Sequence, residues 1–279
     1  MLQLFASDMD GTLLDNQHQI NAQTADAVKA WQASGREFMI ATGRDYKSAS
    51  QLLAPYNIQC AMINLNGAII HDENGQVLAV HPMPQASLEK ILNFLKDQDL
   101  VYTLSTKDAY YHSDIQAYLS MLGRTLKAAG YDDLTQAQVK DHIKDARPIQ
   151  DYLNQDQDQA LKMMVISDNR DLLKTCKDYI QTLEDIDITS SGPDNIELTS
   201  TSAQKGLALA TYLQVRGYQM DQVVTIGDSL NDRSMLAMCP NSYAMANASD
   251  QVKAMAANIA PANDQDGVAQ VIDALLASD

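Results

Sequence analysis

The chain is poor in basic residues, and this shortage excludes several classes of partner. Lys and Arg total 20 against 36 Asp and Glu, which gives a net charge of −16 over 279 residues. A chain this acidic repels nucleic acid backbones and anionic membranes, so we expect neither as a partner. It also repels phosphorylated small molecules, so such a substrate would need cations placed locally at its binding site.

Cysteine clusters, histidine clusters and long apolar runs are lacking as well. Cys60, Cys176 and Cys239 lie far apart without paired spacing, which predicts free thiols in a reducing compartment. The five histidines do not cluster, so a zinc site is not expected. No apolar stretch reaches the length of a membrane span, and Met1 to Asp10 lacks the features of a signal peptide. These absences predict a soluble cytoplasmic protein.

The beginning of the chain alternates short apolar strands with amphipathic helices. The expected strands are Leu2–Ala6, Glu37–Ala41 and Ala61–Leu65, and the expected helices are Asn21–Ser34 and Asp45–Ala54. Apolar strands separated by helices indicate a parallel sheet that is covered on both faces.

Two connectors interrupt this alternation. His81-Pro82-Met83-Pro84 cannot continue a helix, and Ser190-Ser191-Gly192-Pro193 has the composition of a turn. The segment between them has the pattern of an α+β domain, and the earlier alternation resumes afterwards with the strand Ile196–Leu198. We therefore expect an α/β fold with a Rossmann-like parallel-sheet core, residues 1–82 and 192–279, and an inserted α+β domain, residues 83–191.

The segment Asp8-Met9-Asp10-Gly11-Thr12-Leu13 directly follows the first expected strand. In an extended chain, residues i and i+2 project to the same side, so Asp8 and Asp10 are expected to face one point. Two converging carboxylates repel each other unless a cation or a proton compensates, which suits a nucleophile and an acid/base group around Mg²⁺. The alternative is ordinary turn chemistry, which also places aspartate beside glycine.

Two more polar segments follow expected strands, at the carboxyl ends where open α/β sheets bind ligands. Thr42-Gly43-Arg44 offers a hydroxyl, a glycine that admits close approach, and a following helix whose N–H groups suit an anion. Gly227-Asp228-Ser229-Leu230-Asn231-Asp232 contains Asp228, which supplies the oxygen ligands that Mg²⁺ prefers. The alternative interpretation is helix capping by Thr42, Ser229 or Asn231.

Lys205 lies near the start of an expected helix, Ala203–Gln214. A cation at that end opposes the helix dipole at a cost of about 0.3–1 kcal/mol. Its position therefore indicates an anionic group nearby. The alternative is an exposed lysine that only adds solubility.

In this order, and with a long insertion between the second and the third, these motifs resemble those of the haloacid dehalogenase superfamily, most closely its Cof-type phosphatases. The resemblance covers essentially the whole chain. Asp8–Leu13 matches Asp-x-Asp-Gly-Thr-Leu, Thr42 the strand-terminal threonine, Lys205-Gly206 the lysine motif, and Gly227–Asp232 Gly-Asp-x-x-Asn-Asp. Lesser similarities are Asn66-Gly67-Ala68, Ala244–Ala248 and Asp266-Gly267-Val268, with Ala246 where the family commonly has glycine.

The resemblance implies a phosphatase of small phosphorylated metabolites, such as sugar phosphates, nucleotides or cofactor phosphates. Asp8 would form an aspartyl-phosphate, and Asp10 would act as general acid and base. The Asp8 carboxylate, the Asp10 backbone carbonyl and Asp228 would hold Mg²⁺, with Asp232 in support. The residues expected to contact phosphate or substrate are Thr42, Gly43, Arg44, Asn66, Lys205 and Asn231.

Two alternatives stay open. A phosphomutase or other phosphotransferase would use the same aspartyl-phosphate but pass the group to a sugar hydroxyl. A non-catalytic protein that binds phosphorylated metabolites would release no phosphate, although the intact set of Asp8, Asp10, Lys205 and Asp228 argues against it. The expected partner is a small-molecule phosphomonoester. The inserted domain is expected to act as a lid that contacts and selects this substrate. The protein is expected to be a monomer or homodimer.

Overall fold

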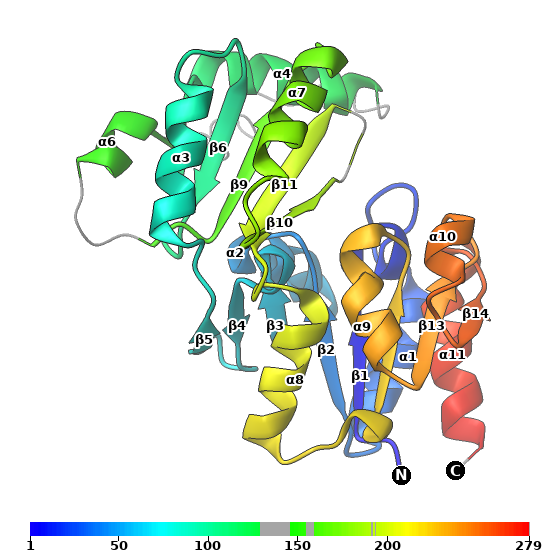
Figure 1. Ribbon diagram of the computed structural model, residues 1–279. Helices are drawn as coiled ribbons and strands as arrows, with labels where there is room; N and C mark the ends of the chain where they lie inside the picture. The colour runs from blue at the N-terminus through cyan, green and yellow to red at the C-terminus, as the bar shows by residue number, and fades with distance from the viewer. Residues whose placement is uncertain (129–145, 155–158, 191, 193, 279) are drawn as a thin grey trace. The chain divides into compact units, whose positions relative to one another are not determined.

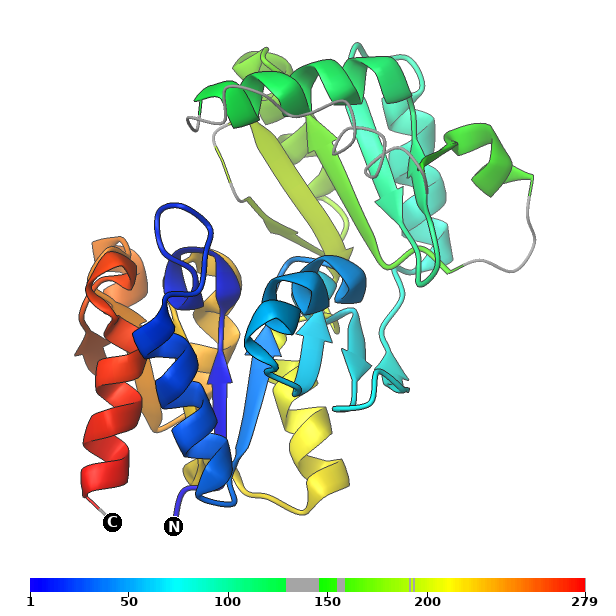
Figure 2. The same ribbon diagram turned by 180° about the vertical axis from the view of Figure 1, so that it is seen from behind.

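A computed structural model describes residues 1–128, 146–154, 159–190, 192 and 194–278 of the chain. The chain forms two compact units, one made of Met1–His81 and Ser202–Asp279 and the other of Pro82–Thr201. Figures 1 and 2 show the elements of both units from opposite sides.

The first unit is built on an eight-stranded sheet with the order β14-β13-β12-β1-β2-β3-β4-β5. The first six strands in this order are parallel: β1 (Leu4–Ser7), β2 (Glu37–Ala41), β3 (Ala61–Asn64), β12 (Val223–Gly227), β13 (Asn241–Met245) and β14 (Asn258–Ala260). An antiparallel pair that the sequence analysis missed, β4 (Ile69–His71) and β5 (Val77–Val80), completes one edge. The α/β fold with a parallel-sheet core is therefore confirmed.

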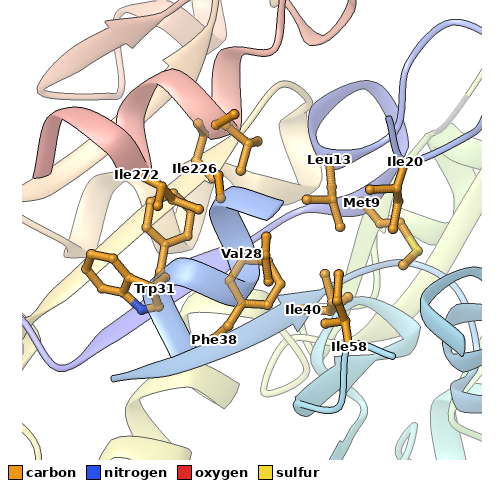
Figure 3. Packing of buried hydrophobic residues seen from close by; sticks show 14 of the residues in the cluster. Met9, Leu13, Ile20, Val28, Trp31, Phe38, Ile40, Ile58, Ile226 and Ile272 are labelled. Carbon is orange, nitrogen blue, oxygen red and sulfur yellow. The ribbon is translucent and has the colours of Figure 1, made fainter. Parts of the chain in front are cut away.

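Helices cover both faces of this sheet, and alternate strand residues pack against them. The helices are α1 (Ala22–Ala33), α2 (Tyr46–Leu53), α8 (Lys205–Arg216), α9 (Arg233–Met238), α10 (Asp250–Lys253) and α11 (Gly267–Ala277). On one face, Phe38 of β2 packs with Val28 and Trp31 of α1 (Figure 3). On the other face, Leu4 of β1 packs with Leu209 of α8. The central strands are apolar on both sides because both sides are buried.

Polar side chains set the starts of several helices. The Asn21 side chain accepts the Thr24 N–H at 2.8 Å before α1, and the Asp45 side chain accepts the Ser48 N–H at 2.9 Å before α2. These caps satisfy N–H groups that have no partner within the helix, and so fix where each helix begins. The start of α2 therefore also determines where the segment after β2, residues 42–45, ends.

The position of β1 creates a switch point in the sheet. Leu4 pairs with Glu37 of β2 on one side and with Val223 of β12 on the other. The strands that follow β1 early in the sequence are therefore added to the sheet on the β2 side of β1, and the strands late in the sequence are added on the β12 side. Because these strands are parallel, the segments that follow β1, β2 and β12 meet at one edge, where open α/β sheets bind ligands.

The second unit has a six-stranded sheet with the order β10-β11-β9-β6-β7-β8, antiparallel except for the pairing of β7 with β8. Its strands are β6 (Val101–Ser105), β7 (Tyr110–His112), β8 (Ala146–Pro148), β9 (Lys162–Ile166), β10 (Ile186–Thr189) and β11 (Asn195–Ser200), and its helices are α3 (Gln85–Leu95), α4 (Ile115–Ala128), α6 (Ile149–Leu153) and α7 (Arg170–Ile180). Leu88 of α3 and Cys176 of α7 pack with Leu104 and Val165 of the sheet. This unit has the α+β composition expected of the inserted domain.

The second boundary of the inserted unit lies later than residues 191–192, where the sequence analysis placed it. The structure divides the chain between Thr201 and Ser202. The strand expected in the core, Ile196–Leu198, belongs to β11, which pairs with β9 and β10 of the second sheet. A hairpin turn and a connector between domains have the same composition, which explains the error. Two residues of that turn, Ser191 and Pro193, lie outside the described residues.

Candidate active site

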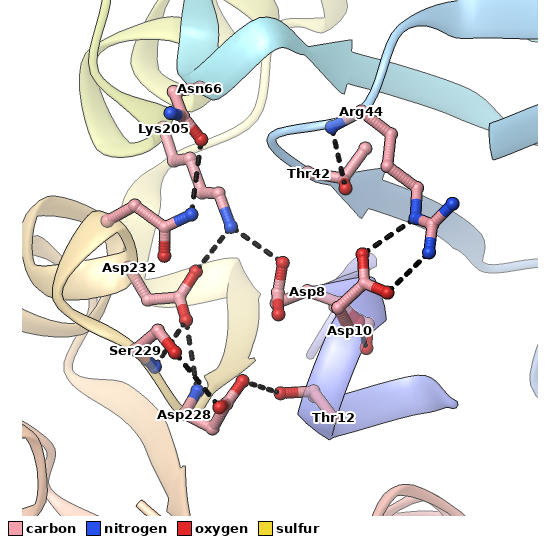
Figure 4. A network of polar contacts seen from close by, with 12 residues as sticks. Asp8, Asp10, Thr12, Thr42, Arg44, Asn66, Lys205, Asp228, Ser229 and Asp232 are labelled. Carbon is pink, nitrogen blue, oxygen red and sulfur yellow. Dashed lines mark hydrogen bonds and ion pairs between the residues drawn. The ribbon is translucent and has the colours of Figure 1, made fainter. Parts of the chain in front are cut away.

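The buried ammonium group of Lys205 contacts two of the sequence motifs. Its Nζ lies 2.6 Å from Asp8 Oδ1 and 2.6 Å from Asp232 Oδ1 (Figure 4). Asp8 follows β1, Lys205 begins α8, and Asp232 lies in the short turn before α9. The Lys205 side chain is fully buried, so the alternative of an exposed solubilising lysine is wrong.

Burial and charge together set the protonation of this cluster. Burial raises the pKa of Asp8, and the Asp232 and Asp228 carboxylates raise it further. Lys205 lowers this pKa, but the pKa of Asp8 still lies well above the ordinary value for aspartate. Burial lowers the pKa of Lys205, but the two contacting carboxylates outweigh that effect and keep the ammonium charged. The cluster contains one ammonium group and three carboxyl groups, those of Asp8, Asp228 and Asp232. The cluster as a whole therefore has an excess of acidic groups.

Hydroxyl groups from two loops fix the Asp228 carboxylate. Thr12 Oγ1 donates to Asp228 Oδ1 at 2.9 Å, and Ser229 Oγ donates to Asp228 Oδ2 at 3.0 Å. Gly11 lies against the same group: a Cβ there would stand 2.7 Å from Asp228 Oδ2, and its φ of +74° suits glycine. The turn after β1 and the loop after β12 therefore meet at Asp228.

The carboxylates of Asp8, Asp228 and Asp232 are arranged as a metal site would require. One oxygen from each lies within 4.8 Å of the others. Asp232 is already engaged, because Oδ1 accepts from Lys205 and Oδ2 accepts the N–H groups of Asp228 at 2.9 Å and Ser229 at 3.0 Å. Asp8 and Asp228 remain to offer oxygen atoms to a hard cation. The oxygen donors and the excess negative charge fit a divalent ion such as Mg²⁺.

Asp10 contacts a different cation from Asp8. Arg44 Nε lies 2.7 Å from Asp10 Oδ2, and Arg44 Nη2 lies 2.6 Å from Asp10 Oδ1 (Figure 4). His18 Nδ1 stands 3.5 Å from Asp10 Oδ1. Burial raises the pKa of Asp10, but the hydrogen bonds and charge of Arg44, with His18, outweigh it and lower the pKa overall. Arg44, expected to contact substrate, is bound to Asp10 and also donates to Ser48 at 3.2 Å.

Asp8 and Asp10 have different partners, so the expectation that they face one point stays a prediction. β1 ends at Ser7, and a turn begins at Met9. Within that turn Gly11 is left-handed, and Asp10 has φ −78° and ψ 123°. The alternation of an extended strand does not continue into such a turn, so the two carboxylates point to different partners.

Thr42 and Gly43 lie at the end of β2. Thr42 is buried, and its Oγ1 accepts the Arg44 N–H at 3.1 Å. This contact lies within the turn after β2 and is not the helix cap of the alternative interpretation, because Asp45 caps α2. It leaves the hydroxyl proton of Thr42 available to an anion. Gly43 lies between them and is partly exposed.

Asn66 and Asn231 contact each other at the same edge. Asn231 Nδ2 donates to Asn66 Oδ1 at 3.1 Å, and the Asn66 N–H donates to the Thr42 carbonyl at 3.0 Å. Leu65 and Asn66 both have left-handed backbones, with φ of 51° and 60°, and such strain in a bulky residue is typical of functional loops. Asn231 Oδ1 is buried and has no hydrogen-bond partner among the described residues, so it can accept from a ligand.

Several residues that were not predicted as site residues also contact the site. Thr12 and Ser229 bind Asp228, His18 is near Asp10, and Asn247 Nδ2 donates to the Gly11 carbonyl at 2.8 Å. Thr12 lies inside the first motif, and Asn247 lies in a segment already compared with the family, so both carried a signal. The sequence carries no comparable signal for His18.

A model of the haloacid dehalogenase-like hydrolase family matches residues 5–272. The chain belongs to the haloacid dehalogenase-like hydrolases. The match includes every site residue described above, from Asp8 to Asn247.

Named relatives of this haloacid dehalogenase-like hydrolase are phosphatases. The chain is 28% identical to Phosphatase YwpJ of Bacillus subtilis, with 99% of this chain and 100% of the relative covered. It is 29% identical to the 5-amino-6-(5-phospho-D-ribitylamino)uracil phosphatase YwtE of the same organism, with 99% and 98% covered. Pyridoxal phosphate phosphatase YbhA of Escherichia coli is 23% identical, with 96% and 97% covered. The chain is an enzyme of the phosphoric monoester hydrolase class, as its motifs predict.

Solved structures agree with the family assignment. A haloacid dehalogenase-like hydrolase from B. subtilis superimposes with a TM-score of 0.85 at 27% identity, covering 98% of this chain and 100% of that one. A Thermotoga maritima protein shares the fold, with a TM-score of 0.78 at 20% identity, covering 98% and 97%. Within the part of the chain that the structure describes, no helix has the length and apolar character to cross a membrane.

Proposed function

We propose that this hydrolase is a Mg²⁺-dependent phosphatase of small phosphorylated metabolites that works through an aspartyl-phosphate on Asp8. The observation that carries the proposal is the buried Lys205 ammonium, 2.6 Å from both Asp8 and Asp232 at the carboxyl end of β1. A nucleophilic carboxylate must be ionised, and Lys205 lowers the pKa of Asp8, although burial and the neighbouring carboxylates keep that pKa well above its ordinary value in the absence of a metal ion.

The Asp8 and Asp228 carboxylates and the Asp10 backbone carbonyl would hold Mg²⁺. When bound, the ion supplies positive charge that lowers the pKa of nearby carboxyl groups and offsets the charge of a phosphate. Asp232 supports this arrangement because it fixes Lys205 and the N–H groups of the loop after β12. Thr12 and Ser229 orient the Asp228 carboxylate.

The reaction would take place in two steps. Asp8 forms a bond to phosphorus while the bond from phosphorus to the leaving oxygen breaks, and Asp10 gives that oxygen a proton. Asp10 then takes a proton from a water molecule whose oxygen attacks the phosphorus, while the bond from phosphorus to the Asp8 oxygen breaks. Inorganic phosphate leaves, and Asp8 and Asp10 return to their initial states. Lys205, Thr42 and Asn231 would bind the phosphate oxygens.

The contact between Arg44 and Asp10 predicts a pH effect. Arg44 lowers the pKa of Asp10 against burial, so Arg44→Gln should raise that pKa. A raised pKa keeps Asp10 in its acid form to higher pH, and we expect the alkaline limb of the kcat/KM profile to move to higher pH. Arg216→Gln is the control, since Arg216 pairs with Glu37 at the start of β2. An alkaline limb that does not move would contradict the role of Asp10 as general acid.

A second variant separates the two contributions of Asp10. We expect Asp10→Asn to lose on the order of 10²–10⁴ in rate, because the amide cannot exchange the proton. Its affinity for Mg²⁺ should change little, because the proposed ligand is the backbone carbonyl. Phosphate release and calorimetric Mg²⁺ titration measure the two quantities. Asp228→Asn, in contrast, should lose Mg²⁺ affinity in addition to rate. Equal Mg²⁺ affinities in the Asp10→Asn and Asp228→Asn variants would be inconsistent with these assignments.

The names of the relatives support the substrate class. They include phosphatases of 5-amino-6-(5-phospho-D-ribitylamino)uracil, pyridoxal phosphate and HMP-PP. Lys205 and Arg44 supply the local cations that an acidic chain needs for such anions. We expect phosphate release from a panel of sugar phosphates, nucleotides and cofactor phosphates, and loss of that release when Mg²⁺ is chelated. Release that persists without Mg²⁺, or ligand binding without any release, would argue against the proposal.

Three expectations stay predictions beside this proposal. A cytoplasmic location is supported by Cys60, Cys176 and Cys239, which are free and buried, as in a reducing compartment. The second unit is expected to act as a lid that selects the substrate. The choice between a monomer and a homodimer also stays open.

A further inference from the structure

Two asparagines that the reaction does not use fix the turn that follows Asp8. Asn247, just after β13, donates from Nδ2 to the Gly11 carbonyl at 2.8 Å. Asn263, before α11, donates from Nδ2 to the Leu14 carbonyl at 2.9 Å. The backbone N–H of Asn263 also donates to Asn247 Oδ1 at 3.1 Å, which connects the Asn247 side chain to the segment that carries Asn263. Residues from the end of the chain therefore bind the turn near its middle and just after its end.

These contacts fix the orientation of both amides. Asn247 uses its nitrogen toward Gly11 and its oxygen toward Asn263, so a reversed amide would place like groups against each other at both ends. Asn263 is buried, and its Nδ2 also contacts Asn16 Oδ1 at 3.3 Å. The Asn247 side chain is thus positioned by the Gly11 carbonyl and the Asn263 backbone, and the Asn263 side chain by the Leu14 carbonyl and Asn16.

The base of this arrangement is closely packed. A Cβ on Gly267 would lie 2.1 Å from the Pro261 carbonyl oxygen, so only glycine fits there. Asp266 beside it accepts from Asn21 Nδ2 at 2.5 Å. The segment that carries Asn263 is therefore held by its own chain and by the segment before α1, which makes it a firm support for the turn.

The turn itself contains the groups whose positions matter most. Its dihedral angles are not helical at Asp10 and Gly11, so the peptide groups there do not follow a helical pattern. The Asp10 carbonyl, proposed to hold Mg²⁺, belongs to the peptide before Gly11, and the peptide after Gly11 carries the carbonyl that Asn247 binds. Thr12, whose hydroxyl fixes Asp228, follows directly. An anchor at the Gly11 carbonyl therefore restrains the neighbours on both sides.

We propose that Asn247 and Asn263 are positioning residues that set the geometry of the Mg²⁺ site through the Gly11 and Leu14 carbonyls. The inference rests on the proposed function, because it concerns the ion that the Asp8 turn would bind. Neither asparagine contacts the ion or the substrate in this scheme. Loss of groups that orient metal ligands typically lowers metal affinity about 10–100-fold.

The test is a calorimetric titration of the substrate-free protein with Mg²⁺ alone. We expect Asn247→Ala, an exposed position where folding should not suffer, to raise the Mg²⁺ dissociation constant about 10–100-fold. Asn241→Ala is the matched control: it also removes an asparagine that donates to backbone carbonyls, those of Asp221 and Val223, but at the opposite end of β13. It should leave the dissociation constant unchanged.

The double variant Asn247→Ala/Asn263→Ala gives a second criterion. Because both side chains restrain the same short turn, their effects should not add fully, and the double variant should bind Mg²⁺ no more than a few-fold more weakly than Asn247→Ala. At saturating Mg²⁺ the single variant should recover most of its kcat. An Mg²⁺ affinity of Asn247→Ala equal to that of the wild type would overturn the inference alone. A wild-type protein that binds no Mg²⁺ would overturn the proposed function and this inference with it.

Discussion

Replacement of Asp8 by asparagine should reduce phosphate release by a factor on the order of 10⁴ or more, the scale on which loss of a nucleophile acts. An amide nitrogen or oxygen does not form the aspartyl-phosphate, so the first step is lost rather than slowed. The side chains are nearly the same size, and Lys205 can still donate to the amide oxygen and to Asp232. The fold should therefore survive the substitution.

Phosphate release from a good substrate of the wild type, at saturating Mg²⁺, measures this effect. Asp15→Asn is the matched control, because Asp15 lies in the same loop but accepts the N–H groups of Gln17 and Gln19 instead of contacting Lys205. It should keep wild-type turnover. Substantial phosphate release by the Asp8→Asn protein would refute the covalent scheme.

Replacement of Lys205 by methionine should remove activity and also destabilise the fold by about 3–5 kcal/mol, the range measured when one partner of a buried ion pair is lost. Both contacts of Lys205 are at 2.6 Å and shielded from solvent, so its loss leaves Asp8 and Asp232 buried without their cation. The pKa of Asp8, already raised by burial and by Asp232, should rise further and leave the nucleophile protonated. Urea unfolding and phosphate release measure the two effects.

A double variant separates stability from chemistry in this cluster. In Lys205→Met/Asp232→Asn one of the unpaired charges is removed, while the new amide oxygen can still accept the N–H groups of Asp228 and Ser229. We expect part of the lost stability to return and the activity to stay absent. If activity returned together with stability, Lys205 would be only a structural residue.

The sequence predicted which segments would meet because parallel strands present their carboxyl ends at one edge of a sheet. Asp8, Asp228 and Thr42 were placed at that edge from strand patterns alone, and the structure brings their loops together. The burial of Lys205 was not predictable in the same way. A lysine at the start of a helix is compatible with both exposure and burial, and only packing against other segments decides between them.

The pairing of Asp10 with Arg44 depends on local dihedral angles that the sequence does not specify. Strand alternation predicted that Asp10 would face the same point as Asp8, but it gave no partner for Asp10, because the turn begins one residue after Asp8. Glycine at position 11 signals a turn without giving the direction of the side chain before it. The contact with Arg44 became visible only with coordinates.

The missed pair of β4 and β5 carried a readable signal. Asn74-Gly75 lies between the two apolar segments, and this dipeptide is typical of a hairpin turn. In the structure Gly75 has a φ of +78°, and Asp72 accepts the N–H groups of Asn74 and Gln76. The boundary at Thr201 lacked such a signal, because β11 has the same apolar pattern as a core strand and is distinguished only by its partners β9 and β10.

The most direct test of the central claim is to trap the phosphorylated enzyme during turnover with borohydride, which reduces an acyl phosphate to an alcohol. Mass spectrometry of the digested protein would then locate the modified residue. We predict conversion of Asp8 to homoserine, only when substrate and Mg²⁺ are both present. Phosphate release that continues while Asp8 stays unmodified, or a modification found at another residue, would contradict it.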